Sequence, residues 1–121
     1  MTYRILGTAT ALMVSATAAF AQQPAAMTFR LTPGDRNPSS CAAADASMSR
    51  VHTVTVAGDV ATIKSNGGIS DKAKSAGPGK YATRFSLSGL TLDITVDTSA
   101  SPATLTAAET KLGCKWTGTA S

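Results

Sequence analysis

The stretch VHTVTVAGDVATIKS, residues 51–65, decides the fold. Apolar and polar residues alternate on both sides of Gly58-Asp59, which is the pattern of two strands joined by a two-residue turn. Pairing residues whose numbers sum to 117 places Val54 opposite Ile63 on an apolar face and leaves threonine and lysine on the other face. Because one register separates the two kinds of side chain, we predict a β-hairpin with a type II′ turn beginning at Gly58.

Residues 81–96 repeat this pattern around Ser88-Gly89. Pairs whose numbers sum to 177 collect the apolar side chains on one face and set Arg84 opposite Asp93 on the other. Opposite charges that face each other across two strands support the same register. We therefore predict a second hairpin, whose loop has either two or four residues because Ser-Gly is only a fair turn sequence.

The flanking segments complete an all-β prediction. Residues 27–32 are predicted as a first strand and residues 112–119 as the last one. Residues 104–110 fit either a short strand or a helical turn, and residues 41–48 fit one or two helical turns or an irregular segment. We expect a single domain over residues 22–121, a small antiparallel meander of five to seven strands that forms a sandwich or an open barrel.

The segment ISDKAKSAGPGK, Ile69–Lys80, is polar and interrupted by glycine and proline, so we predict a mobile, solvated loop. Its cations Lys72, Lys74 and Lys80 are candidates for binding a partner, either an anionic envelope component such as lipopolysaccharide phosphates or another protein. A loop that only increases solubility is the alternative. The chain's net charge of +4 is scattered along the sequence, and we expect no nucleic-acid site.

The first 21 residues have the features of a cleaved secretory signal peptide. Arg4 precedes an uncharged run, Ile5–Phe20, of about 16 residues, and Ala19-Phe20-Ala21 matches a small-x-small cleavage site. That run is shorter than the roughly 18 to 20 residues that span a bilayer. We therefore expect a periplasmic or secreted protein with no transmembrane segment after cleavage.

The chain contains two cysteines, Cys41 and Cys114. In an oxidising compartment an even number of cysteines predicts a disulfide, and only one pairing is available here. The closed loop would span 73 residues, for which the chain-entropy estimate of stabilisation is about 4 kcal/mol. Two free buried thiols are the alternative.

A characteristic layout combines the leader, an early cysteine, glycine-punctuated hairpins and the final motif Gly113-Cys114-Lys115-Trp116. This layout resembles that of small exported bacterial β proteins with a signal peptide and one pair of cysteines. The resemblance implies a β domain clasped by a disulfide, and it implies no particular activity or site residues.

Catalytic and metal-binding motifs are weak. His52, the only histidine, faces Ser65 in the predicted register, so it is a candidate base beside a hydroxyl. No acidic residue that would orient the imidazole is identifiable in the sequence. The alternatives are a buried histidine with a structural role and a pH sensor. One histidine and two cysteines are too few for zinc or copper. Asp93 and Asp97 fit a solvated sheet face better than a calcium or acid–base pair, and Gly77–Lys80 lacks the spacing of a phosphate-binding loop. We expect no cofactor.

These features favour an exported, non-enzymatic binding or envelope-associated domain. Two alternatives are a small carrier of apolar ligands, since curled meanders can enclose a cavity, and an inhibitor of a secreted enzyme. A hydrolase that uses His52 is a further hypothesis.

Overall fold

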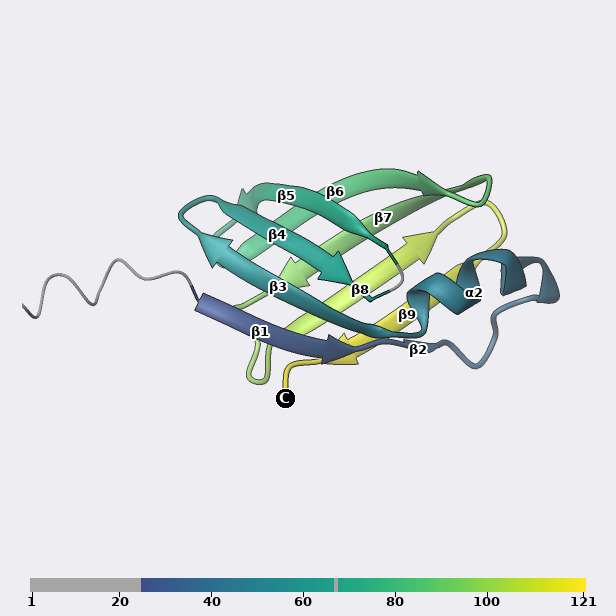
Figure 1. The fold of residues 1–121 in the computed structure, drawn as a ribbon, viewed down its shortest axis with the longest axis horizontal. Helices are drawn as coiled ribbons and strands as arrows, with labels where there is room; N and C mark the ends of the chain where they lie inside the picture. The colour runs from purple at the N-terminus through teal and green to yellow at the C-terminus, as the bar shows by residue number, and fades with distance from the viewer. Residues whose placement is uncertain (1–24, 67) are drawn as a thin grey trace, which may run out of the picture.

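The computed structural model describes residues 25–66 and 68–121, so the predicted signal peptide lies outside the described residues. Within those ranges nine strands form one antiparallel sheet, in the order β1-β3-β4-β5-β6-β7-β8-β9-β2. The sheet curls into a nearly closed barrel (Figure 1). Its elements are β1 (Ala25–Arg30), β2 (Thr32–Pro33), η2 (Ser39–Cys41), α2 (Ala42–Met48), β3 (Val51–Ala57), β4 (Val60–Ser65), β5 (Ser70–Gly77), β6 (Lys80–Leu87), β7 (Leu90–Asp97), β8 (Thr104–Glu109) and β9 (Cys114–Thr119).

The barrel closes because the first strand changes partner at Leu31. Before this residue β1 pairs with β3, and after it β2 pairs with β9. A bridge between Phe29 and Ala120 links the two sides of the junction. At this junction Gly118 of β9 lies so close to the backbone of β1 that an added Cβ would be 2.5 Å from the carbonyl oxygen of Arg30. The absence of a side chain therefore permits the contact between β9 and β1.

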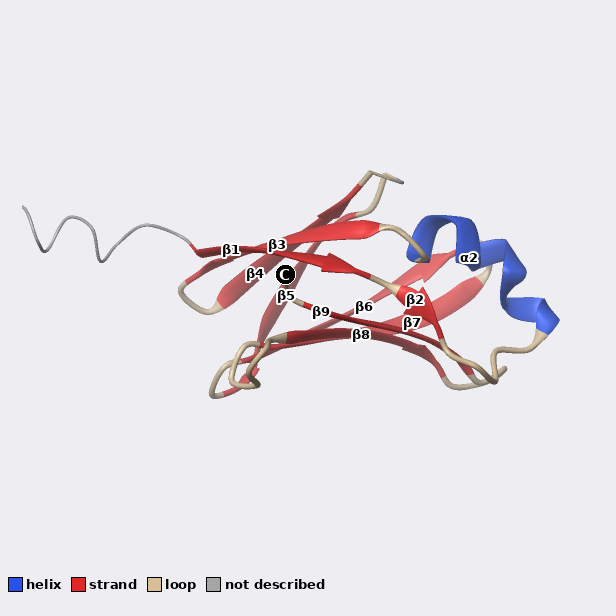
Figure 2. Cartoon of the chain, turned by 90° about the horizontal axis from the view of Figure 1, so that it is seen from below, coloured by secondary structure: helices blue, strands red, loops and turns tan. Residues whose placement is uncertain are grey.

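Apolar side chains from the strands fill the interior of the barrel. The inward positions follow the period of two that strand geometry imposes. The large apolar side chains at most 3% exposed there include Phe29, Leu31, Val54, Ile63, Leu92, Ile94, Val96, Leu105 and Trp116. The short helix α2 lies at one end of the barrel (Figure 2), where Ala44 and Met48 are buried. The helix thus covers an opening that the strands leave.

Both predicted hairpins are confirmed with their registers. Val54 pairs with Ile63 in β3–β4, and Arg84 pairs with Asp93 in β6–β7. In the first turn Gly58 has a φ of 65°, as the first central residue of a type II′ turn requires. In the second, β6 ends and β7 begins on either side of Ser88-Gly89, where φ is 53° and 80°. Two positive φ values define a type I′ turn, so this loop keeps two residues.

The prediction of a loop over Ile69–Lys80 is wrong. Residues 70–77 form β5, which pairs with β4, and Lys80 begins β6. Lysine and serine occupy most of the outward positions of β5. On the inward side the small side chain of Ala73 is 0% exposed, so this strand packs on the core without a large apolar residue. Glycine and proline mark only the irregular end of β5 at Gly77 and the turn at Pro78-Gly79, and they do not interrupt the rest of the segment.

The predicted number of five to seven strands is also wrong, because the described residues contain nine. The additional strands include β5, the two-residue β2, and β8, which resolves the ambiguity over residues 104–110 in favour of a strand. Residues 41–48 are helical. The all-β fold with one disulfide is confirmed, in the form of a barrel.

Candidate functional site

Lys72 and Lys74 project from the outer face of β5 and are exposed. The register with β4 sets Thr62 opposite Lys72 and Ser70 opposite Lys64, so Lys64 shares this face. We call the three lysines, Lys64, Lys72 and Lys74, the basic face. Lys64 cannot be recognised from the sequence as part of this face, because only the pairing of β5 with β4 places it there, diagonal to Lys72.

The acidic residue that directly precedes the first β5 lysine turns toward the interior. Asp71 pairs with buried Ile63 on the inward face, and its Oδ2 accepts a hydrogen bond from the Thr83 hydroxyl at 3.0 Å. Its Oδ1 accepts from the backbone N–H of Lys72 at 2.9 Å. Both oxygens are therefore engaged, and the carboxylate does not share the outer face of Lys72 and Lys74.

Lys80 lies apart from this arrangement because it has an acidic neighbour of its own. It pairs with Asp97 across β6 and β7. A hydrogen bond from the Ser99 hydroxyl is the main cause that lowers the pKa of Asp97, and the charge of Lys80 lowers it further. The structure thus groups two of the three predicted lysines and places the third beside a carboxylate.

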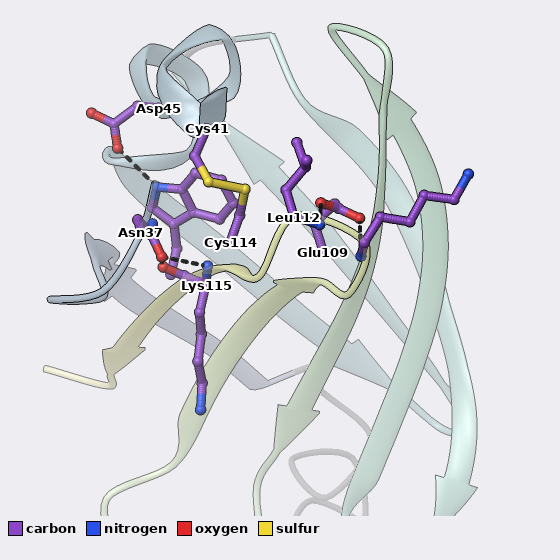
Figure 3. Close-up of a disulfide and its surroundings, with 9 residues drawn as sticks. Asn37, Cys41, Asp45, Glu109, Leu112, Cys114 and Lys115 are labelled. Atoms are coloured by element: carbon purple, nitrogen blue, oxygen red, sulfur yellow. Dashed lines mark hydrogen bonds between the residues drawn. A yellow bond between two sulfur atoms is a disulfide. The ribbon is translucent and has the colours of Figure 1, made fainter. Parts of the chain in front are cut away.

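The predicted disulfide joins Cys41 in η2 to Cys114 at the start of β9, with a Cα–Cα distance of 5.8 Å. Figure 3 shows two further links between the same segments. The Nε1–H of Trp116 donates to Oδ1 of Asp45 at 2.9 Å. Asn37 accepts from the N–H of Lys115 at 2.8 Å and donates to its carbonyl at 2.9 Å. Residues 37–45 are consequently fastened to β9 at three successive positions.

A buried glutamate shapes the turn between β8 and β9. Glu109 is 4% exposed, and its carboxylate accepts from the N–H of Lys111 at 2.6 Å and from that of Leu112 at 2.8 Å. Gly113 closes the turn with a φ of 82° and donates to the Glu109 carbonyl at 3.1 Å. Leu112 is 42% exposed on this turn, the one large apolar side chain that the described residues expose to this extent.

A groove of about 420 Å³ lies between the β8–β9 turn and the β6–β7 hairpin. Arg84 and Asp93 line it and form an ion pair, with Nε donating to Oδ1 at 2.6 Å. Leu90 and Leu112 supply apolar surface on the two sides. The ion pair was predictable from the sequence but the groove was not, because the distance between the two hairpin ends depends on the curvature of the barrel.

His52 is 1% exposed on the inward face of β3, opposite Ser65 as predicted. Its Nδ1 lies 3.0 Å from the carbonyl oxygen of Arg50, while Nε2 has no hydrogen-bond partner among the described residues. Burial lowers the pKa of His52 below its ordinary value of 6.5, and the hydrogen bond with Arg50 opposes this only in part. The imidazole is therefore a buried neutral group, and the hydrolase hypothesis gains no accessible base from it.

The cavity beside His52 is small. Its volume is about 10 Å³ and its other walls are apolar, including Leu31, Met48 and Phe85. That volume is roughly the space of one water molecule, so a carrier of apolar ligands would have to enlarge it. In residues 25–66 and 68–121 no three His, Cys, Asp or Glu side chains gather as candidate metal ligands.

No protein-family model, curated protein or solved structure matches this chain. Within the described part of the chain, none of the helices has the length and apolar character needed to cross a bilayer.

Proposed function

We propose that this protein is an exported, non-enzymatic binding domain that recognises a phosphate-bearing polymer of the cell envelope through its basic face. The observation that carries the proposal is the grouping of Lys64, Lys72 and Lys74 on one outer surface, with the carboxylate of Asp71 turned to the inward side. Lysine ammonium groups bind phosphates as point charges and tolerate variation in the geometry of the ligand.

The sheet spaces these charges regularly. Neighbouring strands lie about 4.8 Å apart, and alternate residues of one strand lie about 6.6 Å apart. A polymer with repeated phosphates can therefore contact several ammonium groups at once. Each contact is weak at the surface, so the summed affinity depends on the number of charges and on ionic strength.

Export is supported by two independent features. The first 21 residues have the charge, apolar run and cleavage pattern of a signal peptide. The Cys41–Cys114 disulfide is of the kind that forms and persists in oxidising compartments. Together they favour the periplasm or the extracellular medium, where anionic envelope polymers are accessible.

Purified lipopolysaccharide and inorganic polyphosphate are suitable probes, because one carries lipid and the other does not. We expect both to bind the protein by titration calorimetry, with an affinity that falls as salt is raised. The double variant Lys72→Glu/Lys74→Glu should weaken binding of both probes by about tenfold or more.

A matched control is Arg30→Glu/Arg36→Glu, which makes the same change in net charge at exposed residues outside the basic face. Equal binding by the control variant and the Lys72→Glu/Lys74→Glu variant would contradict the proposal. The proposal is also wrong if neither probe binds the unmodified protein at low salt.

A further inference from the structure

We propose that the groove between the β6–β7 hairpin and the β8–β9 turn binds an extended protein segment in which a carboxylate lies beside an apolar side chain. The groove has a volume of about 420 Å³, within the range of sites that accept ligands or short peptide segments. It lies on strands other than β4 and β5, which carry the basic face, so the inference goes beyond the proposed function.

The apolar part of the recognition comes from Leu112 and Leu90. Leu112 is 42% exposed on the β8–β9 turn, and Leu90 is half-buried at the start of β7. Both line the groove, one from each side. An apolar side chain placed between them would remove surface of both leucines from water, which is the main favourable contribution to association.

The carboxylate preference comes from the donors that the groove leaves available. Three of the four oxygens of its two carboxylates already accept hydrogen bonds, since Oδ1 of Asp93 accepts from Arg84 Nε and both oxygens of Glu109 accept from backbone N–H groups. Within the described residues the terminal N–H groups of Arg84 and the ammonium of Lys111 bind no protein acceptor, and the Arg84 side chain is 70% exposed. Ligand carboxylates can therefore accept hydrogen bonds from these cations, whereas the one carboxylate oxygen of the described lining that is left unbonded for a cationic ligand is Oδ2 of Asp93.

Both sides of the groove are anchored to the same short segment of chain. The hydroxyl of Ser88 in the β6–β7 turn donates to the carbonyl of Ala43 at 3.3 Å. The β8–β9 turn leads directly into Cys114, which is bonded to Cys41. Residues 41–43 thus hold the two turns at a set separation, and a site whose walls are already positioned loses less conformational entropy when it binds.

The test titrates the disulfide-bonded protein with an amide-capped hexapeptide of alternating leucine and glutamate. Binding is measured from the NMR chemical shifts of the protein. We expect the largest shifts at the backbone amides of Thr91, Lys111 and Leu112. The same peptide with glutamine in place of glutamate should bind about tenfold more weakly, because it loses the charge-assisted hydrogen bonds.

Two variants separate the contributions. Leu112→Ala should weaken the glutamate peptide by about tenfold, and Lys111→Glu should remove the preference for glutamate over glutamine peptides. Arg30→Glu, with the same charge change at an exposed residue of β1, should leave peptide affinity unchanged.

Equal affinity for the two peptides, shifts confined to Lys64, Lys72 and Lys74, or no binding would each overturn the inference. None of these results decides the binding of lipopolysaccharide or polyphosphate, which is measured with different probes and different variants.

Discussion

The Nε1–H of Trp116 donates a 2.9 Å hydrogen bond to Oδ1 of Asp45, a residue 71 positions away in the sequence. Trp116 is 0% exposed, so this bond satisfies a buried polar group from a helix at the end of the barrel. The same carboxylate oxygen accepts from the Ser49 hydroxyl at 2.8 Å. One acidic side chain therefore connects the core, β9 and the end of α2.

Replacing Asp45 with alanine should lower the free energy of unfolding by about 1–3 kcal/mol, because the Trp116 N–H is left buried without an acceptor. Urea denaturation measures this change. Ser49→Ala removes the second hydrogen bond to the same oxygen, and it should lower the free energy of unfolding by less than Asp45→Ala does. If Trp116→Phe does not reduce the effect of Asp45→Ala in the double variant, the two side chains are not coupled as described.

Replacing Cys41 and Cys114 together with alanine should lower the free energy of unfolding by about 4 kcal/mol, since the closed loop spans 73 residues. Denaturation of the oxidised protein and of the double variant provides the comparison. A loss well under 1 kcal/mol would mean that the unfolded chain without the disulfide is as constrained as the chain that has it.

Stability should fall as the pH decreases below about 6.5. Burial lowers the pKa of His52 in the folded protein, so the unfolded chain takes up a proton at a higher pH than the folded one does. The contribution of His52 to the free energy of unfolding is fully present above the pKa of the unfolded chain. It decreases toward acid by at most about 1.4 kcal/mol per pH unit. Chemical denaturation between pH 7.5 and 5.5 measures the slope.

His52→Leu provides the control for this pH dependence, because it removes the only histidine. The variant should show a nearly flat profile over the same range, since carboxylates titrate mainly at lower pH. An unchanged slope in the variant would assign the dependence to other groups.

Gly118→Ala should destabilise the protein by about 1–3 kcal/mol, as overpacking of a close contact does. The added Cβ would lie 2.5 Å from the Arg30 carbonyl oxygen, which belongs to backbone and cannot rotate away. Gly34→Ala is a suitable comparison, because its Cβ would meet no atom closer than 3.4 Å. Similar urea midpoints for the two variants would show that β9 and β1 can separate without cost.

The sequence predicts the two hairpins well because their signals are local. In each, alternating residues lie on both sides of a glycine-containing turn, and the observed registers of Val54 with Ile63 and Arg84 with Asp93 follow directly. The pairing of Cys41 with Cys114 was also predictable, since only two cysteines are present.

The remaining features depend on contacts between distant segments. The inward side of β5 has one fully buried apolar residue, Ala73, so the strand lacks the large apolar side chains that mark a strand in the sequence. Its neighbour β4 supplies the backbone hydrogen bonds that make it one. The groove beside Leu112 and the grouping of Lys64 with Lys72 depend likewise on the curvature and order of the sheet, to which no short pattern corresponds.

The change of partner at Leu31 has a consequence for biosynthesis. Thr32 reaches its partner Thr117 across 85 residues, a stretch that a ribosome takes about 4 to 17 s to translate at roughly 5–20 residues per second. During that interval β2 has no partner strand, because β9 has not yet been synthesised. The barrel of a newly made chain therefore cannot close until β9 has been synthesised.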